Sequence, residues 1–172
     1  MNLATAIARE HNKVQRDRIV AYIGADPKRF AELVQLFLAG PYRITQRASW
    51  PLSTCIENHP QLITPHLRKI LALLQQEGIH DAVKRNVLRL LQYITIPKSL
   101  QGIVIDLCFK YLSGTQEPVA IRAFSITLLT NLAGNIPELK NELISIIEQR
   151  LPYEKPAFVS RSTKALTLLR KP

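Results

Sequence analysis

Apolar residues along this chain recur at the spacing of one face of an α-helix. Leu67, Ile70, Leu71 and Leu74 form one such stripe. Leu139, Leu143, Ile146 and Ile147 form another. Residues at these separations point to the same side of a helix and can bury together. Sustained alternation of apolar and polar residues, which favours strands, is absent. The pattern therefore predicts an all-α protein.

Proline and glycine mark the ends of the apolar-periodic segments. Asp26-Pro27 indicates an N-cap followed by proline at the first helical position, and Gly40-Pro41 ends one helix and begins the next. We expect an N-terminal helix over about 4–24 and further helices near 27–39, 41–57, 65–77, 80–94, 97–112, 117–133, 137–151 and 156–170. Pro51 should kink the helix that contains it. The short linkers predict that consecutive helices pack antiparallel.

An arginine recurs once per pair of predicted helices. Arg47, Arg85, Arg122 and Arg161 are separated by 38, 37 and 39 residues, and an apolar residue precedes each by three positions. A period of this length on helical segments is typical of a stacked array of helix pairs.

Two stretches indicate how the predicted helices are grouped into repeats. Residues 65–74, a turn over 76–80 and residues 82–91 resemble a HEAT repeat, and so do residues 107–112 followed by 118–124. The resemblance implies a right-handed α-α superhelix of about four HEAT-like helix pairs. It implies a single domain over 1–172, with a capping helix at 1–26 and repeats near 27–58, 59–96, 97–135 and 136–172. Functionally it points to binding of other macromolecules, although architecture alone does not define function.

The positive charge is uneven along the chain, which carries a formal net charge of +10. The second helices of the four pairs, over 41–58, 79–95, 116–134 and 155–172, hold 11 basic and three acidic residues, whereas the rest holds 12 and 10. The resemblance places second helices on the concave face of the array. Such a face would attract an acidic partner.

Seven basic residues are therefore candidates for an anion-binding or partner-binding row. They are Arg47, Lys84, Arg85, Arg89, Arg122, Arg161 and Lys164. An alternative for the four repeated arginines is a structural role between repeats. HEAT repeats commonly place an aspartate in the turn before the arginine, but only Asp81 and Glu117 are candidates here, so such a ladder would be partial. Lys84, Arg89 and Lys164 could instead belong to a merely solvated face.

The sequence motifs of several enzyme classes are absent from this chain. No glycine-rich phosphate loop, no HExxH-type metal motif and no GxSxG element is present. The chain also resembles, distantly, the alkylation-repair DNA glycosylases built from HEAT-like repeats. Those enzymes use an aromatic-lined cleft and an aspartate. Here Trp50 is the only tryptophan, and Thr54 rather than a carboxylate follows it by one helical turn. We expect no catalytic residue, metal or cofactor.

The sequence thus predicts a non-enzymatic interaction scaffold whose basic concave face binds an acidic protein segment. The alternative is a nucleic-acid-binding module related to the glycosylases. The longest uncharged run, residues 123–137, is too short and too polar for a membrane span. Cys55 and Cys108 have no nearby partner and favour small buried side chains over reactive thiols. We expect a cytoplasmic protein that is monomeric or weakly dimeric through its C-terminal helix.

Overall fold

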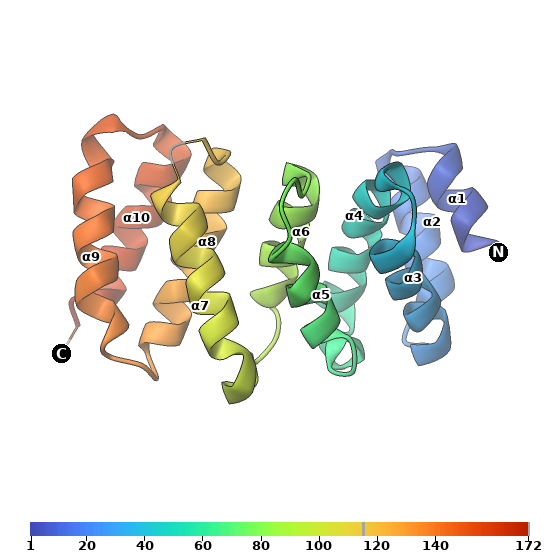
Figure 1. Ribbon diagram of the computed structural model, residues 1–172, viewed down its shortest axis with the longest axis horizontal. Coiled ribbons are helices and arrows are strands. Elements are labelled where there is room, and N and C mark those ends of the chain that lie inside the picture. Colours follow the sequence, from blue (N-terminus) through green and yellow to red (C-terminus); the bar gives the residue numbers. More distant parts are fainter. Residues whose placement is uncertain (115, 172) are drawn as a thin grey trace. The chain divides into compact units, whose positions relative to one another are not determined.

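The computed structural model describes residues 1–114 and 116–171, and its regular elements there are all helical (Figure 1). The chain divides into two compact units, Met1–Thr95 and Ile96–Pro172. This boundary falls within one residue of the predicted boundary between the second and third repeats. The all-α prediction is confirmed, and the helix pairs are those of an α-solenoid. The prediction of a single domain, with the repeat bounds given above, stays a prediction.

The first unit begins with two short helices, α1 (Leu3–Arg9) and α2 (Lys13–Ile23), where one helix over 4–24 was predicted. That prediction was wrong at residues 10–12. The Asn12 side chain accepts a hydrogen bond from the backbone N–H of Gln15, at 2.8 Å, and so starts a new helix. An asparagine followed three residues later by glutamine is a signal for a helix start. The sequence therefore contained a signal for the break between α1 and α2.

Two helix pairs complete this unit. The first is α3 (Pro27–Ala39) with α4 (Tyr42–Asn58), and the second is α5 (Leu67–Leu74) with α6 (Asp81–Leu91), after a short 3-10 turn, η1 (Pro60–Ile63). As predicted, Asp26 caps α3 by accepting from the N–H groups of Lys28 and Arg29. At α6 the cap is His80, whose Nδ1 accepts from the N–H of Ala82 at 2.9 Å.

The second unit contains α7 (Lys98–Ser113) with α8 (Val119–Ala133), and α9 (Leu139–Arg150) with α10 (Pro156–Leu169). A 3-10 turn, η2 (Leu151–Tyr153), connects the last two helices. In Figure 1, helices α7 to α10 lie side by side with short connections. The bounds of these four helices differ from the predicted ones by at most two residues at each end, whereas α5 and α6 in the first unit end three residues earlier than predicted.

The second helix of each pair packs on the second helix of its neighbour within the same unit. Helix α4 contacts both α3 and α6, and α8 contacts both α7 and α10. Buried polar side chains take part in the contact between α4 and α6, where Asn86 Nδ2 on α6 donates to Ser49 Oγ on α4 at 2.9 Å. We call α4, α6, α8 and α10 the second helices below, because the seven basic residues proposed from the sequence lie on them.

Both cysteines belong to the core. Cys55 and Cys108 are fully buried and unbridged. Burial raises the pKa of the Cys55 thiol to about 12, and burial likewise raises the pKa of Cys108 to about 12 against a small opposing effect of a hydrogen bond with Ser125. Neither thiol is therefore ionised near neutral pH, as a reactive cysteine would be.

Two glycines give a matched test of the packing. A Cβ at Gly40, in the turn between α3 and α4, would lie 2.8 Å from Cγ2 of Ile44 and closer still to the Leu36 carbonyl oxygen. A Cβ at Gly102, inside α7, would meet nothing within 4 Å. We expect Gly40→Ala to destabilise the protein by about 1–3 kcal/mol through overpacking. Gly102→Ala should stabilise it by about 0.5–1 kcal/mol through helix propensity.

The two variants should shift the melting temperature in opposite directions when thermal unfolding is followed by circular dichroism. Equal shifts of the same sign would contradict the packing of the α3–α4 turn.

Candidate binding surface on the second helices

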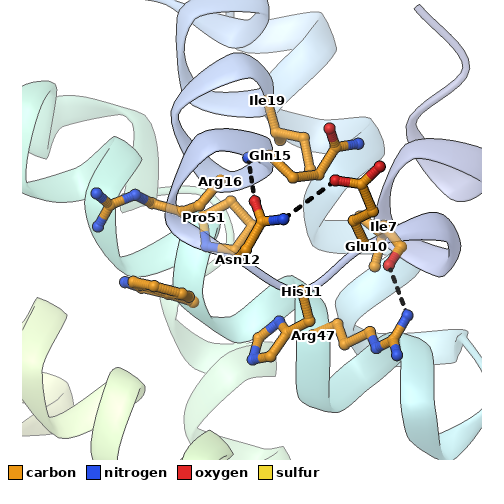
Figure 2. A pocket seen from close by; sticks show the side chains of 10 residues that line it. Ile7, Glu10, His11, Asn12, Gln15, Arg16, Ile19, Arg47 and Pro51 are labelled. Atoms are coloured by element: carbon orange, nitrogen blue, oxygen red, sulfur yellow. Dashed lines mark hydrogen bonds between the residues drawn. The ribbon is translucent and has the colours of Figure 1, made fainter.

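Arg47 on α4 is bound to the backbone of α1. Its Nη1 donates to the carbonyl oxygen of Ala8. It also donates, at 3.4 Å, to the carbonyl oxygen of Ile7 (Figure 2). These carbonyls lie in the last turn of α1, where helical hydrogen-bond partners are missing and the helix dipole favours a cation. The break at residues 10–12 creates this helix end, so Arg47 has a structural partner that the sequence did not reveal.

Arg89 joins the two second helices of the first unit. Its Nη2 lies 2.7 Å from Glu57 Oε2 at the end of α4, and the hydroxyl of Tyr93 donates to Glu57 Oε1 at 3.0 Å. Both charged side chains are about one-third exposed. A hydrogen-bonded carboxylate neutralises Arg89 locally, so this residue contributes little net charge to the surface.

Arg122 on α8 is the most deeply buried of the repeated arginines, at 8% exposure. It forms an ion pair with Glu154, which follows η2 and also accepts from Arg150 Nε at 3.0 Å. Its guanidinium carbon lies 5.4 Å from the centre of the Phe158 ring on α10. Arg122 therefore connects α8 to the segment that leads into α10, and its charge is matched inside the unit.

Arg85, Arg161 and Lys164 differ from these three. Arg85 on α6 is exposed, and no hydrogen bond or ion pair ties it to other residues in the described part of the chain. Arg161 on α10 donates from Nη1 to the neutral Thr127 Oγ1, at 2.9 Å. Lys164, one turn further along α10, is exposed. Lys84, the seventh candidate, lies 3.8 Å from Asp81 and has further contacts, so it is not a free cation.

A small hollow lies where α4 meets the turn between α1 and α2 (Figure 2). His11, Arg16 and Arg47 are among its lining residues. Burial lowers the pKa of His11, and the positive charges of Arg47 and Arg85 lower that pKa further. The cavity volume is about 10 Å³, which is room for about one water. This hollow is too small to hold a ligand group.

Trp50 on α4 is covered by its neighbours. The guanidinium carbon of Arg16 lies 4.7 Å from the ring centre, and His11 meets the ring edge-on at 5.7 Å between centroids. A stacking platform for a nucleobase needs an open aromatic face. The Trp50 ring is therefore a packing element between α4 and the N-terminal helices.

A larger pocket lies between α8 and α10 in the second unit, with a volume of about 180 Å³. Seven residues line it: Thr127, Thr130, Asn131, Arg161, Lys164, Ala165 and Leu168. They follow helical spacing on both helices, so one face of each helix contributes. The lining includes two cations and no acidic residue. The charged pair was a sequence candidate, whereas the neutral residues carry no signal that sequence reasoning could have used.

Neither a metal centre nor a membrane span is found in the part of the chain that the structure describes. No three side chains of the His, Cys, Asp or Glu type come together there as possible ligands. Among the same residues, no helix has both the length and the apolar character needed to cross a bilayer.

The comparison with protein families gives a match over most of the chain. The model of the HEAT repeat domain family matches residues 3–166, so the chain belongs to the HEAT repeat family. The resemblance seen in the sequence is confirmed. Comparisons with curated proteins and with solved structures gave no match. HEAT repeat domains are typically non-catalytic scaffolds, and membership of the family indicates a role in protein interactions.

The different contacts of Arg122 and Arg161 predict different losses of unfolding free energy when each is replaced. Arg122→Gln removes one partner of a buried ion pair and leaves Glu154 with only Arg150, so we expect a loss of about 3–5 kcal/mol in the free energy of unfolding. Arg161→Gln removes a single bond to a hydroxyl at a partly exposed site and should cost about 1 kcal/mol or less. Urea unfolding followed by circular dichroism measures both. Similar losses for the two variants would contradict the different roles assigned to them.

The position of Arg85 can be tested through the pKa of His11. Arg85→Gln removes a nearby positive charge, so the imidazolium form becomes less unfavourable and the pKa of His11 should rise toward its ordinary value. An NMR titration of the histidine ring signals measures this shift. Arg18→Gln, an exposed change of equal charge on α2, is the control and should leave the pKa of His11 nearly unchanged. An unchanged pKa in Arg85→Gln would show that this arginine points elsewhere.

Proposed function

We propose that this member of the HEAT repeat family is a non-enzymatic scaffold whose second helices bind an acidic segment of a partner protein. The observation that carries the proposal is the difference among the candidate cations. Arg85, Arg161 and Lys164 reach the surface without a carboxylate partner among the described residues, whereas Arg89 and Arg122 are paired with glutamates. Unpaired cations on the second helices of each unit supply both attraction and orientation for an acidic chain.

The proposed binding set is therefore narrower than the seven candidates. Arg85, Arg161 and Lys164 bind the partner. Arg47, Arg89 and Arg122 stabilise the fold, and Lys84 sits beside Asp81. This assignment supports the structural alternative for some of the repeated arginines and the binding alternative for the others.

Nucleic acid is the weaker candidate partner. Trp50 lies on a second helix, but Arg16 and His11 occupy its ring. The α8–α10 pocket has no aromatic side chain in its lining. Base stacking thus lacks a platform at both places, and only the phosphate contacts common to all basic surfaces remain.

We further propose that the chain works in the cytoplasm. The support is its pair of unbridged cysteines, which fits a reducing compartment. Microscopy of the tagged full-length chain tests this location.

The binding proposal is tested by removing the three proposed cations together. We expect Arg85→Gln/Arg161→Gln/Lys164→Gln to weaken binding of poly-L-glutamate by about tenfold or more, because each loses a charge-assisted contact. Isothermal titration calorimetry at fixed salt measures the affinity. The control is Lys28→Gln/Lys98→Gln/Lys110→Gln, which removes the same charge from exposed positions on α3 and α7.

Equal weakening by the two triple variants would mean that net charge alone controls binding, and would contradict the proposal. A duplex DNA that binds more tightly than poly-L-glutamate, with a slope of log K against log salt concentration of about −2.7 for three neutralised phosphates, would favour the nucleic-acid function instead.

A further inference from the structure

The α8–α10 pocket combines charge with an apolar wall. Arg161 and Lys164 stand on α10 at one end of a stripe that continues through Ala165 to Leu168. Leu168 is 54% exposed although it is a large aliphatic side chain. A partner that covered both the cations and Leu168 would remove this apolar surface from water and would offer its own charge to Arg161 and Lys164.

The guanidinium of Arg161 is held in place across the pocket. Thr127 Oγ1 donates its proton to the Ala123 carbonyl, at 3.2 Å, and accepts the hydrogen bond from Arg161 Nη1, at 2.9 Å. A hydroxyl whose proton is already used presents only its lone pairs, so it orients the guanidinium. The remaining N–H groups of Arg161 are available for a second acceptor, and a carboxylate fits them best because it can bond bidentately.

The size of the pocket limits what can enter. Its volume of about 180 Å³ is close to that of an engineered cavity of about 150 Å³ that holds one benzene. One side-chain group therefore fits between α8 and α10, while a neighbouring group of the same ligand can cover Leu168. The neutral side of the pocket, Thr130 and Asn131, adds hydrogen-bonding groups at the rim.

We infer that this pocket is a specificity site for an acidic side chain followed closely by an aliphatic one in the partner segment. The carboxylate binds Arg161 and Lys164, and the aliphatic side chain packs on Ala165 and Leu168. The inference rests on the proposed function and narrows it from any acidic segment to one that alternates acidic and aliphatic residues. A sugar–phosphate chain would satisfy the cations but would leave Leu168 uncovered.

Two short acetylated peptides of equal charge serve as probes. One alternates glutamate with leucine, and the other alternates glutamate with serine. We expect the full-length protein to bind the glutamate–leucine peptide about threefold to tenfold more tightly, because only leucine buries apolar surface against Leu168. Calorimetry measures both affinities.

Two single variants at exposed positions separate the two contacts without disturbing the core. Leu168→Ser should weaken the affinity for the glutamate–leucine peptide by about threefold or more. It should leave the affinity for the glutamate–serine peptide unchanged. Lys164→Gln should weaken both peptides. Val14→Ser, at an exposed valine on α2, and Lys98→Gln are the matched controls and should change neither affinity.

The outcomes distinguish the inference from the function on which it rests. If both peptides bind equally and Leu168→Ser changes neither, the specificity pocket is overturned, while the effect of the triple variant on poly-L-glutamate still supports the acidic partner. If neither peptide nor poly-L-glutamate binds, the proposed function fails, and the inference fails with it. If the protein forms dimers that Leu168→Ser dissociates in light scattering, a second copy covers the pocket and the inference is overturned.

Discussion

The contact between neighbouring second helices is the interaction on which the rest of each unit depends. In the first unit α4 packs on α6, and in the second unit α8 packs on α10. A second helix such as α4 or α8 therefore has one side against the first helix of its own pair and another against the next second helix. Only a narrow face of it remains accessible, and the residues on that face determine what the surface can bind.

The repeated arginine lies on the second helices, and its role follows from how deeply its side chain is buried. Arg122 is nearly buried, and a buried guanidinium needs a charged partner because desolvation without one is costly. Glu154 meets that need. Arg85 is exposed, so water solvates it and no internal carboxylate is required. One position in the repeat thus serves structure in some copies and remains accessible in others.

Much of the fold could be predicted from the sequence because proline, glycine and Asp26 act locally on helix ends. The break at Asn12 was missed although the capping signal formed by Asn12 and Gln15 was present in the sequence. The partners of the arginines could not be predicted in the same way. Glu154 follows a 3-10 turn 32 residues after Arg122, and the carbonyls that bind Arg47 became available only through the break. The walls of the α8–α10 pocket are neutral residues whose spacing also fits ordinary packing.

The covered tryptophan has a practical consequence. Trp50 is the single tryptophan of the chain and lies in the first unit, in contact with Arg16 and His11. Its fluorescence emission therefore reports on the first unit alone, whereas the far-ultraviolet helix signal sums over both. A denaturation experiment that records the two signals together distinguishes one cooperative transition from two independent ones, without any label attached to the protein.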